Sequence, residues 1–173
     1  AAHGKLTGQP GICMVTRGPG ATNASIGVHT AMQDSAPMIL LVGQVGTQMK
    51  GREAFQELDY KAVFGTMVKW AVEIDDVVRI PEIISRAWKT ATTGRPGPVV
   101  VALPEDMLTS ATDVAPLQGG FPMAEPAPDA GAMAQMHALL GAAKRPLILY
   151  GGCNWQADGM AALQAFAEAA DIP

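Results

Sequence analysis

Short apolar runs alternate with segments of helical spacing along this chain, and this alternation constrains the fold most strongly. The runs that we predict to be strands are residues 11–16, 37–43, 69–74 and 95–104. Helices are predicted over 21–33, over 53–63 and between Asp76 and Gly94. Strands that are apolar on both faces are typical of a parallel sheet covered by helices on both sides. We therefore predict an α/β fold that binds ligands at the carboxyl ends of its strands.

The composition changes after residue 108, where the chain becomes rich in Pro, Ala, Gly and Ser and loses its periodicity. Residues 109–128 are therefore predicted to be a linker between a first domain, 1–108, and the start of a second, 129–173. The second domain is predicted to be the beginning of a Rossmann-like α/β unit, with a helix at about 130–142, a strand at 146–150 and a helix at about 158–170. Because AAHGKLTGQPG resembles the end of a helix, we expect the chain to be a piece of a longer one.

Charge and composition exclude several classes of protein. Nearly half of the residues (49%) are apolar, 16% are charged, and the net charge is -4, which does not favour nucleic-acid binding. No apolar run approaches the roughly 18 residues of a membrane span. Nothing supports a disulfide between Cys13 and Cys153, and a reducing cytoplasm is the simpler expectation. The three histidines, His3, His29 and His137, do not have the spacing of metal ligands.

The stretch TRGPGATN, residues 16–23, follows the first predicted strand and leaves three interpretations open. Gly18 and Gly20 allow close approach to the backbone, while Pro19 stiffens the loop. The loop could cradle a phosphate at the start of the next helix, although it matches neither common phosphate-binding pattern. It could form a stiff wall for a flat ligand, with Asn23 as a polar contact. It could also be a plain turn in which Thr22 or Asn23 caps the helix.

Two further stretches follow later strands. In AFQELD, residues 54–59, Phe55 and Gln56 are expected near the same sheet edge as the glycine loop; alternatively, Phe55 plugs a core and Gln56 is solvated. Glu105 and Asp106 follow the strand GPVVVALP at its carboxyl end and are candidates for chemistry. An adjacent pair of carboxylates in a turn is, however, more often solvated.

Taken together, these stretches resemble the thiamine-diphosphate-dependent enzymes of the acetolactate synthase and pyruvate oxidase group. The resemblance runs, in the order of that family, through VTRGPGATNASIGVHTAMQDSAPMILLVGQV, AFQE, VKW, IPEIISRAW, TGRPGPVVVALPED and LYGGC. It implies three α/β domains, of which this chain would hold most of the pyrimidine-binding domain and the start of the central domain. It also implies a 2-keto acid decarboxylase or carboligase, with this piece inactive alone.

The resemblance implies a role for each matching residue. Those expected at the pyrimidine ring of thiamine diphosphate are Gly18, Pro19, Gly20, Asn23 and Gln56. Those expected on the substrate side are Phe55, Gln56 and Glu105. No catalytic or metal-binding residue is expected here, because the family's glutamate would precede Ala1 and its magnesium motif belongs to the third domain. The cofactor of the family lies between two chains, which implies a homodimer or homotetramer.

Some features leave the exact reaction open. Typical acetohydroxyacid synthases have proline at the position of Gly46 and lysine at that of Glu105. A carboxylate in place of the lysine reverses the electrostatic field that acts on an anionic keto acid. The interaction energy of a unit charge at ~4 Å is up to ~4 kcal/mol. We therefore expect a related carboligase or decarboxylase. The GGC turn at 151–153 resembles one near FAD in some relatives, which leaves FAD binding open. The alternative function is a non-catalytic nucleotide-binding or interaction module.

Overall fold

The computed structural model describes residues 1–118, 122, 126–152 and 155–173. The chain divides into two compact units, Ala1–Met123 and Ala124–Pro173. This division falls within the segment that was predicted to be a linker, while the domain bounds 1–108 and 129–173 themselves stay predictions. Cys153, in the GGC turn, lies outside the described residues.

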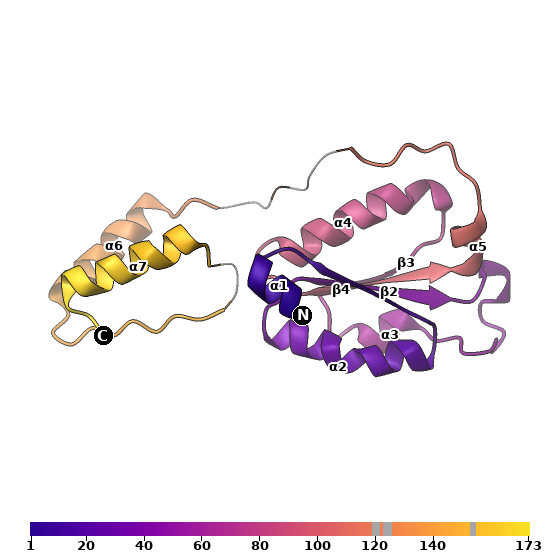
Figure 1. Cartoon of the computed structure of the whole chain (residues 1–173), viewed down its shortest axis with the longest axis horizontal. Helices are drawn as coiled ribbons and strands as arrows, with labels where there is room; N and C mark the ends of the chain where they lie inside the picture. Colours follow the sequence, from indigo (N-terminus) through magenta and orange to yellow (C-terminus); the bar gives the residue numbers. More distant parts are fainter. Residues whose placement is uncertain (119–121, 123–125, 153–154) are drawn as a thin grey trace. The chain divides into compact units, whose positions relative to one another are not determined.

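The first unit is built on a four-stranded sheet in which every described pairing is parallel (Figure 1). The strands are β1 (Gly11–Val15), β2 (Met38–Gln44), β3 (Trp70–Glu73) and β4 (Pro98–Pro104), in the order β1-β2-β4-β3. The helices are α1 (Ala2–Thr7), α2 (Pro19–Gln33), α3 (Tyr60–Phe64), α4 (Ile80–Thr92) and α5 (Glu105–Thr109), with short 3₁₀ turns η1 (Thr47–Met49) and η2 (Val77–Arg79). The predicted α/β class is confirmed.

Alternate residues of the two central strands enter two separate cores, because successive side chains of a strand point to opposite faces. Figure 1 shows α2 and α3 on one face of the sheet and α4 on the other. The core under α2 and α3 includes Leu40, Val42, Val100, Tyr60 and Phe64. The core under α4 includes Ile39, Val99, Val101, Ile83 and Ala87. Burial on both faces explains why β4, and β2 as far as Val42, are continuously apolar.

Strand β1 differs from the prediction in its burial. The run at 11–16 was expected to be a buried strand, but Ile12 and Met14 are 62% and 64% exposed. The cause is its position, since β1 is an edge strand that pairs with β2 alone. An apolar run therefore predicted the strand correctly but not its burial.

The predicted helix over 53–63 is wrong over most of its length, because regular helix begins only at Tyr60. Glu53 and Gln56 have positive φ angles of 54° and 65°, which a helix does not allow. The carboxylate of Glu57 accepts hydrogen bonds from the backbone N–H groups of Gly51 and Ala54, at 2.6 and 3.1 Å. These bonds close the segment into a compact turn before α3.

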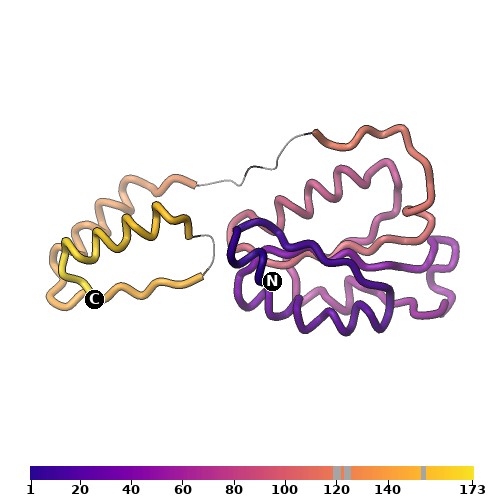
Figure 2. Tube along the Cα trace, viewed as in Figure 1, coloured from indigo at the N-terminus to yellow at the C-terminus, as the bar shows by residue number. Residues whose placement is uncertain are grey.

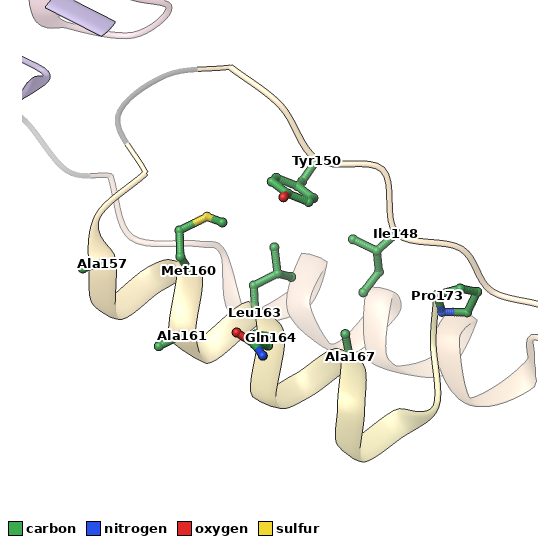
Figure 3. Close-up of a pocket in the computed structure, with 9 residues that line it drawn as sticks. All are labelled: Ile148, Tyr150, Ala157, Met160, Ala161, Leu163, Gln164, Ala167 and Pro173. Atoms are coloured by element: carbon green, nitrogen blue, oxygen red, sulfur yellow. The ribbon is translucent and has the colours of Figure 1, made fainter. Parts of the chain in front are cut away.

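The second unit contains the two predicted helices, α6 (Ala130–Ala142) and α7 (Ala157–Ala170). The strand predicted at 146–150 is wrong for the described structure, in which no neighbouring strand of this unit lies beside it; Ile148 N–H instead donates to the Pro173 carbonyl at 3.0 Å. Figure 3 shows Ile148, Tyr150 and Leu163 around a hollow of about 610 Å³ lined by this segment and α7. The extended segment at 146–150 and α7 therefore border an apolar groove.

Candidate functional site

The carboxyl ends of β1, β2 and β4 meet at one edge of the sheet, on the right in Figures 1 and 2. Two contacts join the loops there. A guanidinium nitrogen of Arg17, in the loop after β1, lies 2.5 Å from a carboxylate oxygen of Glu105, the first residue of α5. The backbone N–H of Thr47, after β2, donates to Asp106 at 3.0 Å. Residues far apart in sequence are thereby held at a single edge.

The backbone conformation of residue 18 explains why this residue is a glycine. Its φ of 57° and ψ of -113° are strained for any residue with a side chain, and it is the N-cap residue of α2, followed by Pro19 in the first turn. A Cβ on Gly18 would lie 2.7 Å from Cβ and 3.1 Å from the carbonyl oxygen of Gln56. A Cβ on Gly20 would lie 2.7 Å from the methyl carbon of Thr16. The atoms that approach these glycines thus come from the chain itself.

The Gly18–Gln56 contact brings together the two segments that were expected at one edge, the glycine loop and AFQE. Pro19 and Asn23 are exposed, and Phe55 is 77% exposed. The alternative in which Phe55 plugs a core is therefore wrong, and Gln56 is half-buried rather than fully solvated. That these four residues line one cleft, and that they bind a cofactor or substrate, stays a prediction.

The amides of Asn23 and Gln56 are free to meet a ligand, because neither has a hydrogen-bond partner within the described part of the chain. The first turn of α2 has no side-chain cap, so the interpretation of Thr22 or Asn23 as the capping residue is wrong. The Thr22 hydroxyl instead donates to the carbonyl of Pro19 at 3.1 Å. Asn23 therefore has an exposed side-chain amide that neither caps α2 nor forms a hydrogen bond within the described part of the chain.

We expect Asn23→Ala to change the free energy of unfolding by less than about 0.5 kcal/mol, as is usual for an exposed side chain without partners. The matched control is Asp59→Ala, since the Asp59 carboxylate accepts from the N–H groups of Lys61 and Ala62 at 2.9 and 3.1 Å and caps α3. That variant should lose about 1 kcal/mol. Urea unfolding compares the two, and equal losses would mean that Asn23 has a structural role.

Glu105 and Asp106 both have partners at this edge, and the side chain of Glu105 is still mostly exposed to solvent, so a role of the pair in chemistry stays a prediction. Arg17 balances the charge of Glu105; the two side chains are 24% and 66% exposed. Hydrogen bonds from the Thr47 hydroxyl and then from its backbone N–H hold the pKa of Asp106 below its usual value. Because the adjacent Arg17 offsets its charge, Glu105 does not act on an anionic substrate as an isolated negative charge.

Three residues that the sequence reasoning missed form hydrogen bonds with the loops of the candidate site or with the segments next to them. Gln44, at the end of β2, is 2% exposed; its amide nitrogen donates to the Leu58 carbonyl at 2.8 Å and its oxygen accepts from Val45 N–H at 3.0 Å. Glu57 closes the turn that carries Gln56, and the hydrogen bond from Gly51 is the main reason that its pKa lies below the usual value. A polar residue ending an apolar strand was the available signal for Gln44.

Tyr60 is the third missed residue, and its hydroxyl accepts a buried hydrogen bond from the backbone N–H of Gly18 at 2.9 Å. Burial raises the pKa of the phenol above its ordinary value, partly offset by that hydrogen bond. The hydroxyl is therefore neutral at physiological pH. No pattern in the sequence pointed to this contact, because Tyr60 is also an ordinary core position of α3.

Two kinds of feature are absent from the part of the chain that the structure describes. No group of three or more His, Cys, Asp or Glu side chains is arranged to hold a metal ion there. Among the same residues, no helix is long and apolar enough to span a membrane.

Comparisons with known proteins show what the chain is similar to. Residues 1–63 match the family described as thiamine pyrophosphate enzyme, N-terminal TPP binding domain. The chain is 37% identical over 174 residues to the acetolactate synthase large subunit of Corynebacterium glutamicum, covering 99% of this chain and 28% of the relative. It is also 37% identical to isozyme 3 of the large subunit from Escherichia coli, covering 98% of this chain and 30% of the relative.

A eukaryotic relative matches over a shorter stretch. The mitochondrial acetolactate synthase of Schizosaccharomyces pombe is 42% identical over 109 residues, which is 63% of this chain and 16% of the relative. The chain thus spans less than a third of the length of these curated relatives.

Proposed function

Because these matches confirm the resemblance to thiamine-diphosphate-dependent enzymes of the acetolactate synthase group, we propose that this chain forms the pyrimidine side of a thiamine-diphosphate site. The whole protein would decarboxylate a 2-keto acid and transfer the remaining fragment to an acceptor. The observation that carries this proposal is the meeting of Gly18 with Gln56 at the carboxyl edge of the sheet. That contact joins two motifs that are 38 positions apart in the sequence.

The exposed groups at this edge fit an aminopyrimidine ring. The ring is flat, has apolar faces and carries donors and acceptors on its edge. Pro19 and Phe55 offer exposed apolar surfaces, and the free amides of Asn23 and Gln56 can donate and accept hydrogen bonds. Thiamine diphosphate, when bound, supplies the electron sink for the reaction, while protein residues bind and orient it.

The described residues do not offer a phosphate or metal site at this loop. Gly18 N–H is already bonded to Tyr60, and Pro19 has no N–H, so two of the donors of a phosphate cradle are missing. We therefore assign the diphosphate and its Mg²⁺ to a domain outside this chain, supplied by a second copy in a homodimer or homotetramer. A cytoplasmic location belongs to the same proposal, while FAD binding stays open.

The pair Arg17–Glu105 supports an anionic 2-keto acid as the substrate class. With a carboxylate 2.5 Å away, the guanidinium of Arg17 is oriented at the sheet edge and partly exposed. Arg presents several N–H donors in a fork, so it can hold Glu105 with one nitrogen and a substrate carboxylate with another. Glu105 would then lower the affinity for the anion without excluding it.

A titration of this chain with a small probe tests the proposal. The probe is 4-amino-5-hydroxymethyl-2-methylpyrimidine, followed by NMR on ¹⁵N-labelled protein. We expect millimolar affinity, near 4 kcal/mol, because only one side of the site is present. The shifted amides should be those of Gly18, Gly20, Asn23, Phe55 and Gln56.

Variants sharpen this test. Asn23→Ala removes one free amide and should weaken probe binding roughly fivefold, the value of about one net hydrogen bond. Gln48→Ala, an exposed glutamine in η1, is the control and should bind normally. Shifts confined to α4 on the opposite face, or no shifts at all at saturating probe, would overturn the proposed function.

A further inference from the structure

The segment from Gln56 to Tyr60 touches the glycine loop twice, at the same residue. Gln56 packs on one side of Gly18, where a Cβ would find its atoms at 2.7, 3.1 and 3.3 Å. The hydroxyl of Tyr60 accepts a hydrogen bond from the backbone N–H of Gly18 at 2.9 Å. Gly18 itself is buried. The residue that precedes the exposed Pro19 is thus clamped from two directions.

Tyr60 is itself held firmly. Tyr60 as a whole is 2% exposed, and its ring lies 6.4 Å from the ring of Phe64, centroid to centroid, within the core under α2 and α3. The Asp59 cap sets the direction in which α3 starts, and Tyr60 is the first residue of that helix. A side chain fixed at both its ring and its backbone presents its hydroxyl at one place. That place is the N–H of Gly18.

The Gly18 conformation needs such an anchor. With φ 57° and ψ -113° it lies where only glycine is comfortable, and glycine also has many other conformations available. An anchor that selects one of them sets the direction of Pro19 and the first turn of α2, including Asn23. A buried N–H also costs free energy when it has no acceptor, so the loop is penalised for leaving Tyr60.

We propose that Tyr60 is a positioning residue, which fixes the glycine loop through Gly18 so that Pro19 and Asn23 face a bound pyrimidine ring. This proposal rests on the proposed function for the nature of the ligand. It assigns Tyr60 no contact with the ligand itself. Its hydroxyl acts through the Gly18 backbone.

The test is Tyr60→Phe, which keeps the ring and removes only the hydroxyl. Tyr150→Phe is the matched control, because Tyr150 is the other tyrosine of the chain and lies in the second unit. Hydrogen exchange of the Gly18 amide is measured first. In Tyr60→Phe it should become roughly tenfold faster, the effect of losing about one hydrogen bond, with the Leu40 amide in the central strand unchanged. The control should change neither amide.

Probe affinity is the second readout, measured with the same aminopyrimidine well below the unfolding temperature. Tyr60→Phe should weaken binding about fivefold, because the glycine loop would be mobile in this variant and would have to become ordered on binding. Tyr150→Phe should bind like the wild type. Unchanged Gly18 exchange, or faster exchange with unchanged affinity, would overturn the positioning role. Equal acceleration at Gly18 and Leu40 would show a general loss of stability and would also overturn it. If the wild-type chain does not bind the probe, the proposed function is overturned. Faster Gly18 exchange in Tyr60→Phe would then show that the hydrogen bond between Gly18 and Tyr60 stabilises the loop without positioning it for a ligand.

Discussion

Gly18→Ala is expected to destabilise the first unit by roughly 2–5 kcal/mol, the largest effect of any single change at the glycine loop. Two costs add. The backbone conformation of Gly18 is strained for alanine, and the new Cβ would lie 2.7 Å from Cβ of Gln56 and 3.1 Å from its carbonyl oxygen. The nearest atoms belong to a backbone turn closed by Glu57, so they cannot simply rotate away. Urea unfolding monitored by far-UV circular dichroism measures the loss.

Gly27→Ala is the matched control for this change. Gly27 lies within α2, and a Cβ there would meet no atom within 4 Å. Alanine in the interior of a helix is more favourable than glycine by up to about 1 kcal/mol, so this variant should be more stable than the wild type. If Gly18→Ala and the wild type had the same urea midpoint of unfolding, the glycine loop and the turn that carries Gln56 would not be in contact in solution.

Gln44→Ala is expected to cost roughly 3–5 kcal/mol, because it combines a cavity with unpaired buried groups. The Leu58 carbonyl and the Val45 N–H would both lose their partner, and Glu73 would lose a contact of 3.3 Å. Leu58 follows the turn that presents Gln56, so the loss should also loosen the site. Urea unfolding gives the stability, and exchange of the Gln56 amide reports the turn.

Two further variants separate the causes. Gln44→Met keeps the side-chain volume and removes the hydrogen bonds. Its free energy of unfolding should therefore be about 1–3 kcal/mol below that of the wild type, a smaller loss than for Gln44→Ala. Gln48→Ala, on the exposed η1 turn, should change stability by less than about 0.5 kcal/mol. If Gln44→Met is as stable as the wild type, the polar contacts of Gln44 do not stabilise the fold and cavity formation explains the whole effect.

The order of strands and helices in the first unit was determined by the sequence itself. The runs at 37–43 and 95–104 contain the continuously apolar stretches 38–42 and 98–104, which are typical of strands buried on both faces, and both form central strands. Pro81 and Gly94 bracket the helix α4 as local backbone preferences demand. Such features are local, because propensity, proline geometry and side-chain period act over a few residues.

The candidate site could be predicted only in outline. Parallel strands bring their carboxyl ends to one edge, so the sequence placed Pro19 and Gln56 at the same edge of the sheet. It did not show that Gly18 packs on Gln56 or bonds to Tyr60, since both contacts join the glycine loop to a segment 38 or more positions away. Nor did it show that Arg17 offsets the charge of Glu105, 88 positions apart. Contacts of this kind depend on distances in space that no local pattern records.

Tertiary structure also decided where local preference was overruled. The apolar run at 11–16 forms a strand as predicted, but its place at the sheet edge leaves Ile12 and Met14 exposed. The run at 146–150 has strand composition and forms no strand in the described unit, because a strand is stable only when a neighbour pairs with its N–H and C=O groups. The segment before Tyr60 has helical composition, yet the Glu57 carboxylate draws the N–H groups of Gly51 and Ala54 into a turn. Burial, strand pairing and side-chain capping each require a partner in space, and a linear sequence does not specify which partner is near.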